Sequence, residues 1–322
     1  MASKISIAIH TDLRGGIMAL FSFSRLSLPF SLTRHLWFPI TLLLSVMILM
    51  MGSLLYKGLN WGIDFKGGIL LEVRFSRLPD LEKVRRFVQQ SDNFGKEATI
   101  QQYGDAKRPM ILIRAAEKKI DIPSIQKRFQ TALKDSVVFE KYDHVGAKLG
   151  KELMKASTWA LLFALFGIGG YIWIRFDWMF SVASWIALAY DCSALILFFS
   201  LFYQEIGEGA MVAFLVTAGY SVNDTVIVFD RIRENRGYKK NLSCAELVDL
   251  SINETLSRTV LTSMTTLAAL LVLYILGGSV IATYSLPMII GIASGTISSI
   301  LIAAPVFYLL SQFDRKKRAE GF

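Results

Sequence analysis

Two aspartates lie inside long apolar segments, where a charged side chain is rare. Asp191 and Asp224 are each the only charged residue of their segment. A charge near the middle of a bilayer-spanning helix costs about 2.5–3.5 kcal/mol on insertion scales, and such residues usually face the bundle interior and mark a proton or ion path. Asp191 is therefore predicted to carry protons. The alternative is a buried acid that is hydrogen-bonded by neighbours such as Tyr190 and Ser193.

Asp224 is followed seven residues later by Arg231, which lies on the same helical face. Arg231 could hold the Asp224 carboxylate charged, or release it when the pair breaks, and the three residues Asp191, Asp224 and Arg231 together would then form a proton relay. Asp224 is expected roughly 10 Å nearer the cytoplasm than Asp191, so a water-linked relay is favoured over direct contact. The structural alternatives are an Asn223–Asp224 pair that bends the helix and an Arg231 that only marks the membrane boundary.

Small and hydroxyl residues form two further patterns. Gly291, Gly295 and Ser299 recur at every fourth position, which permits close helix packing, within the chain or against a partner. The second pattern is a hydroxyl-rich turn that could line the proton path, although helix packing is favoured. Its members are Thr262, Ser263, Thr265 and Thr266.

A glycine-rich stretch runs from Trp61 to Gly68. Gly62, Asp64, Gly67 and Gly68 allow a tight turn with positive φ values. A phosphate-binding loop is the alternative, but no Gly-Lys-Ser/Thr signature follows. The stretch is predicted to be a structural turn that leads into a folded domain.

Composition agrees with a membrane protein. The 322 residues are 53% hydrophobic and only 19% charged, with a mean hydropathy of +0.45, which excludes disordered, collagen-like and disulfide-scaffold classes. The net charge of +9 is interpreted as a sign of orientation and not of nucleic-acid binding. Cys192 and Cys244 are not expected to meet, and the three histidines show no metal-ligand spacing.

Six apolar runs are long enough to cross a bilayer as helices. They are residues 36–56, 156–174, 178–202, 210–229, 259–276 and 284–310. The first run starts too late for a cleavable signal peptide and is interpreted as a retained helix.

The distribution of Lys and Arg predicts the orientation. Fifteen positive residues fall in the tail 1–35, the link at Arg175, the loop 230–258 and the tail 311–322, and none falls in the short loops on the other side. Positive residues favour the cytoplasm, so both termini are predicted to be cytoplasmic in a multi-pass protein of the inner membrane. The loop 230–258 also holds Ser243-x-x-Glu246, a capping-box pattern, which predicts an interfacial helix.

The stretch 57–155 is then extracytoplasmic. It reads as strand 69–75, a helix to about residue 90, strands 99–103 and 110–114, helix 121–134 and strand 137–142. The order βαββαβ indicates a ferredoxin-like α+β domain. The predicted fold class is therefore an α-helical polytopic membrane protein, with six transmembrane helices and one such domain.

Several segments resemble the bacterial SecF family over roughly residues 36–310. They are Asn60–Gly68 (NWGIDFKGG), Ala187–Asp191 (ALAYD), Gly219–Asn235 (GYSVNDTVIVFDRIREN), Arg258–Leu267 (RTVLTSMTTL) and Ser285–Ile300. One departure is Val145-Gly146-Ala147, where the family usually has Gly-Pro.

The resemblance implies a non-enzymatic, RND-type subunit of the Sec pathway that uses the proton-motive force in late stages of protein export. Protons would be the coupling ion, and no cofactor is implied. The implied partners are a SecD-like subunit, the Sec translocon channel, a membrane insertase, translocating preproteins and membrane lipid. The family's proton path includes a membrane aspartate in the segment of Asp191.

Two other functions remain open. An intramembrane aspartyl protease would explain two membrane aspartates, but its dyad needs close carboxylates, and Ser221-Val222-Asn223-Asp224 lacks the Gly-x-Gly-Asp pattern of those proteases. A small-molecule exporter of the RND type would have about twice as many helices.

Overall fold

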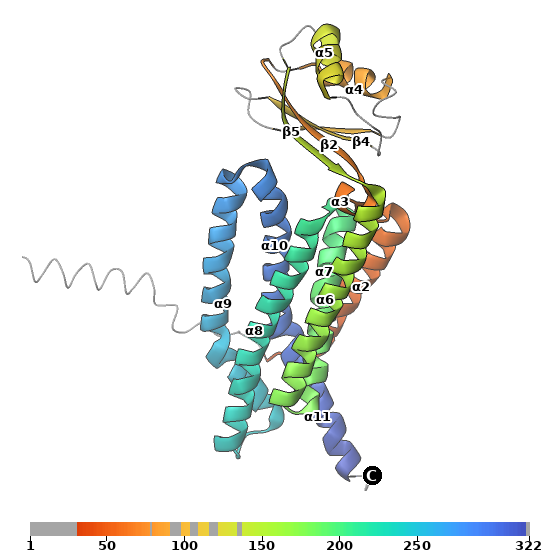
Figure 1. Ribbon diagram of the computed structural model, residues 1–322. Coiled ribbons are helices and arrows are strands. Elements are labelled where there is room, and N and C mark those ends of the chain that lie inside the picture. The colour runs from red at the N-terminus through yellow and green to blue at the C-terminus, as the bar shows by residue number, and fades with distance from the viewer. Residues whose placement is uncertain are drawn as a thin grey trace, which may run out of the picture.

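A bundle of long helices carries a small sheet domain beyond one end (Figure 1). The computed structural model describes residues 31–77, 79–90, 98–103, 109–115, 122–133 and 137–319. Residues 1–30 of the N-terminal tail lie outside the described residues, and with them three of the fifteen positive residues, Lys4, Arg14 and Arg25.

Within the described residues, six helical segments are long and apolar enough to cross a membrane. The first five are single helices: α2 (Trp37–Lys57), α6 (Ala147–Arg175), α7 (Trp178–Leu201), α8 (Glu208–Tyr238) and α9 (Cys244–Leu276). The sixth, Ile281–Asp314, runs through three consecutive elements. Each overlaps one predicted span, and the six-helix prediction is confirmed.

The helix predicted at the membrane surface is not a separate element. Ser243 forms the predicted capping box with Glu246, but the helix that starts there continues without a break into the fifth span as α9. Leu247 and Leu256 are buried in the bundle core. The prediction of a separate interfacial helix was therefore wrong, because these apolar residues pack on the bundle.

The last span is interrupted by one wide turn. Helix α10 (Gly278–Ser298) passes into the π-helical turn η1 (Ser299–Ala303), which passes into α11 (Ala304–Ala319). Pro305 lacks a backbone N–H, and its ring conflicts with the carbonyl four residues earlier, which is that of Leu301 inside η1. A local change to wider hydrogen bonding accommodates this conflict, and such turns often lie at functional sites.

The sheet domain has the predicted βαββαβ order. Its elements are β2 (Gly68–Phe75), α4 (Leu81–Gln90), β3 (Thr99–Tyr103), β4 (Met110–Ala115), α5 (Ile122–Leu133) and β5 (Val137–Val145). The strands form one antiparallel sheet in the order β3-β4-β2-β5, as in ferredoxin-like sandwiches. Helices α4 and α5 cover one face (Figure 1), over a core that includes Ile69, Val84 and Phe129.

The sheet domain joins the bundle through a few short elements, which together form the joint between the two parts. Strand β1 (Asn60–Trp61) and helix α3 (Ile63–Lys66) precede β2, and β1 pairs in parallel with β6 (Glu205–Ile206) between α7 and α8. On the return, β5 ends at Val145 and α6 begins at Ala147, with Gly146 in an extended conformation at its N-cap. The usual family proline would fall at the first position of α6, which favours proline without requiring it, so Ala147 leaves the linker geometry intact.

The segment before α2 is held against the opposite end of the bundle. Leu32 is buried in the core beside residues of α7 and α8. The Asp249 carboxylate of α9 accepts hydrogen bonds from the Ser31 hydroxyl, from Thr33 Oγ1 at 2.7 Å and from the Thr33 backbone N–H at 3.1 Å. This anchor fixes the direction in which the chain enters α2.

Candidate functional site

Both predicted proton carriers are buried inside the bundle. Asp191 on α7 and Asp224 on α8 are each 1% exposed. Their helices pack against α10, which bonds Asp191 through two hydroxyl groups, while α9 bonds Asp224 through one. A polar centre therefore forms within the apolar bundle, between four neighbouring helices.

Two serines of α10 bind the Asp191 carboxyl group. Ser294 Oγ donates to Oδ1 at 3.1 Å, and Ser298 Oγ donates to Oδ2 at 2.9 Å. The spacing of four residues puts both serines on one helical face. Ser193, which the structural alternative named as a partner of Asp191, instead donates to the carbonyl of Ala189 in its own helix.

Asp224 is bonded on one side only. Ser263 Oγ on α9 donates to Oδ2 at 3.3 Å, and Ser263 accepts a bond of 2.6 Å from Thr296 Oγ1 on α10. Among the described residues, Oδ1 of Asp224 has no hydrogen-bond partner, and neither has Oγ1 of the nearby Thr259, one helical turn before Ser263. Buried polar atoms without a partner are uncommon, and this oxygen has a lone pair available for a proton.

Hydroxyl groups connect the surroundings of the two acids. Ser298, which bonds Asp191, lies 3.4 Å from the hydroxyl of Ser221, and Ser221 precedes Asp224 by less than one turn of α8. Each carboxyl group has its own hydroxyl partners, and the described residues show no bond between the two carboxyl groups. The arrangement gives no support to an aspartyl protease dyad, whose carboxylates share a proton, and a relay between the two acids stays a prediction.

Arg231 does not pair with Asp224. Its guanidinium bonds Glu254 at 2.6 Å through Nε and Glu234 at 2.6 Å. Glu254 also accepts a bond from Lys239 at 3.0 Å. The hypothesis of an Asp224–Arg231 pair was wrong, because seven residues separate these side chains by about 10 Å along the helix while Glu254 reaches Arg231 from α9.

The small residues of α10 form an intramolecular contact with α8. A Cβ atom on Gly291 would overlap the side chain of Thr217, and one on Gly295 would lie 3.1 Å from the Cβ of Ser221. Ser299 is buried and begins the π-helical turn. Of the two packing partners that the sequence left open, the structure shows the one within the chain.

The glycine-rich stretch forms a turn, as predicted, but it also holds the short helix α3. Gly67 and Gly68 have φ values of 76° and 147°, which only glycine adopts easily. Gly62 is the N-cap of α3, and the Asp64 carboxylate accepts a 3.2 Å bond from the backbone N–H of Glu208 at the start of α8. The turn therefore fastens the sheet domain to the bundle.

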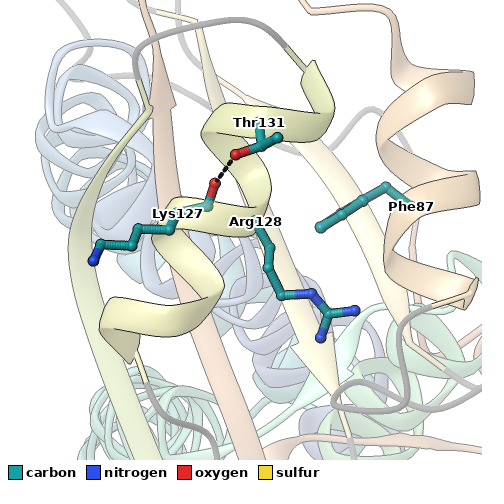
Figure 2. Close-up of a pocket in the computed structure, with 4 residues that line it drawn as sticks. All are labelled: Phe87, Lys127, Arg128 and Thr131. Atoms are coloured by element: carbon teal, nitrogen blue, oxygen red, sulfur yellow. Dashed lines mark hydrogen bonds between the residues drawn. The ribbon is translucent and has the colours of Figure 1, made fainter.

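The sheet domain also has an open hollow of about 340 Å³ between α4 and α5, lined by Phe87, Lys127, Arg128 and Thr131 (Figure 2). Lys127 and Arg128 are exposed, and the Thr131 hydroxyl donates to the carbonyl of Lys127. This basic surface lies on helices α4 and α5, on the side of the sheet domain that is away from the bundle (Figure 1). It is not part of the aspartate site.

Sequence reasoning missed the hydroxyl residues of α10 and α8. Ser294, Thr296 and Ser298 lie in an apolar run, where the glycines drew attention to packing alone. The spacing of Ser294 and Ser298, four residues apart, was the available signal. In the hydroxyl-rich turn of α9, Ser263 contacts Asp224, whereas Thr266 bonds Tyr220 at 3.0 Å.

Comparison with known proteins gives consistent results. The family described as "Protein export membrane protein SecD/SecF, C-terminal" matches residues 125–313, and the SecD/SecF GG motif matches residues 52–77. "Protein translocase subunit SecF" of Rickettsia bellii (strain OSU 85-389) is 39% identical over 272 residues, which cover 82% of this chain and 86% of the relative. The corresponding protein of Rickettsia prowazekii (strain Madrid E) is 37% identical over 296 residues, covering 88% and 92%.

Two solved structures are similar as well. A crystal structure of SecDF from Thermus thermophilus, described as a translocon-associated membrane protein, has 35% identity and a TM-score of 0.77, covering 88% of this chain. SecDF in its super-membrane-facing form has 32% identity and a TM-score of 0.64, covering 92% of this chain. This chain spans only 39% and 40% of those two longer chains.

The matched segments include the glycine-rich turn and all helices that bear the two aspartates. The chain is thus a multi-pass protein of the inner membrane and a transport component with a role in protein export. It belongs to the SecF family of protein translocase subunits.

Proposed function

We propose that this chain uses the proton-motive force to promote late stages of protein export across the cytoplasmic membrane, with Asp191 and Asp224 as the proton-carrying groups. The observation that supports this most directly is the pair of buried aspartates with hydroxyl partners, from α10 for Asp191 and from α9 for Asp224. Protons are the coupling ion in this proposal, and the chain is a motor subunit and not an enzyme.

Serine hydroxyls suit a carboxyl group that gains and loses a proton. A hydroxyl donates to a carboxylate, and it accepts a bond from a protonated carboxylic acid after rotation of its hydrogen. Ser294 and Ser298 can therefore satisfy Asp191 in both states, but with different bonding directions. Protonation changes how α7 is tied to α10 without opening a gap in the core.

A transmembrane potential of 100 mV supplies about 2.3 kcal/mol per elementary charge. One proton per step therefore biases a two-state equilibrium by a few kcal/mol, which is enough to change its populations substantially. The helices that respond are α7, α8 and α10, and the first two lead directly to the joint with the sheet domain.

The similar SecDF structures are longer than this chain. A SecD-like subunit would supply the remaining helices, and the exposed apolar side of α9, including Leu271, Val272 and Ile275, would face that subunit or membrane lipid. The Sec translocon channel, the membrane insertase and translocating preproteins are the other proposed partners. Both termini are proposed to be cytoplasmic, and residues 57–155 extracytoplasmic.

The proposal is tested by Asp191→Asn, which keeps the shape of the side chain and removes the titrating proton. Inner-membrane vesicles with this variant and its SecD-like partner should lose the gradient-dependent stimulation of precursor export, while abundance and partner binding stay normal. The matched control is Asp177→Asn at the start of the same helix, where the side chain makes no capping bond. Full stimulation by Asp191→Asn at equal abundance would leave the aspartate with a structural role only.

A further inference from the structure

We propose that Glu205 is the positioning residue that makes the sheet domain follow movements of α7 and α8. It lies in the short connection between these two helices. Its carboxylate contacts Arg114 in the sheet domain and the backbone of Ile63 in α3, which precedes the domain. That protons cause the movement rests on the proposed function. That Glu205 links the two parts of the molecule rests on its contacts alone.

The Glu205 carboxylate has a different partner on each oxygen. Oε2 forms an ion pair with the guanidinium of Arg114 at 2.5 Å, and Oε1 accepts the backbone N–H of Ile63 at 3.2 Å. The side chains of Glu205 and Arg114 are only 18% and 25% exposed. Removing one member of a largely buried pair leaves the other charge unpaired in a place of low polarity, which is strongly unfavourable.

The backbone around Glu205 is fixed to the bundle side of the same joint. Glu205 and Ile206 pair in parallel with Asn60 and Trp61, and the N–H of Gly62 donates to the carbonyl of Ile206 at 2.9 Å. A Cβ atom on Gly62 would lie 2.9 Å from Oε1 of Glu205. The glycine at this position therefore makes room for the carboxylate.

Arg114 conveys the contact to the whole sheet. It lies near the end of β4 and faces Leu70 of the central strand β2 and Thr99 of β3 in register. A displacement of the α7–α8 connection is therefore passed to strand β4 through Arg114, and to helix α3, which precedes β2, through Ile63. Asp191 is on α7, which ends at Leu201, and Asp224 is on α8, which begins at Glu208, so Glu205 lies in the connection between the two helices that bear the aspartates.

A distance measurement by pulsed electron paramagnetic resonance tests the inference on the full chain with its SecD-like partner. The native thiols, Cys192 and Cys244, are replaced by alanine. Spin labels are placed at two exposed positions, Gln89 on α4 and Val212 on α8. We expect one narrow distance distribution in the parent protein, and a clearly broader one in both Glu205→Gln and Arg114→Met.

The matched control is Arg74→Met. Arg74 also forms an ion pair with a glutamate, Glu140 at 2.9 Å, but both residues belong to the sheet of the domain and the pair does not reach the bundle. Its loss should leave the distance distribution narrow. Because Glu205→Gln and Arg114→Met break the joint from opposite sides, one remains usable if the other fails to accumulate.

Coupling is measured by adding Asp191→Asn. It should shift the distance distribution when Glu205 is present and leave it unshifted in the Glu205→Gln background, and Glu205→Gln should also lose export stimulation that Arg74→Met retains. Narrow, unchanged distributions in both joint variants, or an Asp191→Asn shift that persists without Glu205, would overturn the inference. Broad joint variants together with full export by Asp191→Asn would support the joint and contradict the proton-carrier role.

Discussion

The two buried aspartates differ in how their carboxyl oxygens are satisfied. Both oxygens of Asp191 accept serine hydroxyls of α10, whereas Asp224 has one bonded oxygen and one without a partner among the described residues. The Asp191 carboxyl group, with both oxygens bonded, holds α7 against α10. One with an unpaired oxygen is the easier point of proton entry, so the two acids are suited to different steps.

Ser298→Ala is predicted to weaken proton coupling without loss of folding. A hydrogen bond to a charged group contributes about 1.5–3 kcal/mol, so gradient-dependent export stimulation should fall by about tenfold or more. The variant is compared with the parent in vesicles at equal abundance.

The control is Ser193→Ala, whose hydroxyl bonds only a carbonyl of its own helix and should be dispensable. Equal export by Ser298→Ala and Ser193→Ala would show that the α10 hydroxyl has no part in coupling.

Each lone charge in an apolar segment was sufficient to predict that Asp191 and Asp224 face the interior of the bundle, because a charged side chain that faces lipid is costly. Their partners were not predictable in the same way. Ser294 and Ser298 are more than 100 residues away from Asp191 in sequence, and only the packing of α10 on α7 brings them together. The same reason explains the error at Arg231, whose real partner Glu254 comes from a different helix.

Helix α10 packs closely against α8 because glycine residues of α10 lie at the contact. Gly291 and Gly295 face Thr217 and Ser221 directly. Ser294 and Ser298 bond Asp191, and Thr296 bonds Ser263, the partner of Asp224 on α9. The glycine pattern predicted the close contact. The π-helical turn after Ser298 was not predicted, because it results from Pro305 acting within a continuous apolar helix.

Gly295→Val is predicted to separate α10 from α8. Side chains that overfill a packed interior typically cost about 1–3 kcal/mol, so the melting temperature in mild detergent should fall together with export stimulation. Gly219→Val on α8 is the matched control, since a Cβ atom there would meet nothing within 4 Å. An unchanged melting temperature for Gly295→Val would mean that the two helices are not held together at this position.

At the scale of the whole molecule, the bundle and the sheet domain were both predictable, because each has its own hydrophobic periodicity. The joint between them was not, because β1 and β6 are only two residues long and pair over a sequence separation that no local pattern reports. Glu205 and Arg114 looked like ordinary surface charges in the sequence. Only the folded arrangement shows them as one half-buried pair.

Orientation in the membrane is a prediction at the same scale. Cysteine at Gln89 on α4 should react with a membrane-impermeant maleimide in intact spheroplasts, and cysteine at Tyr238, the exposed end of α8, should react only after permeabilisation. The positive residues near Tyr238 favour the cytoplasmic side. The reverse labelling pattern would invert the proposed topology.

The central claim is that the Asp191 carboxyl group gains and loses a proton inside the bundle. The most direct measurement is infrared difference spectroscopy of the reconstituted complex during a pH change within its working range. We predict the carbonyl stretch of a protonated carboxylic acid that appears and disappears with pH in the parent protein, persists in Asp177→Asn and is diminished in Asp191→Asn. An identical carboxylic acid band in the parent and in Asp191→Asn would contradict the account.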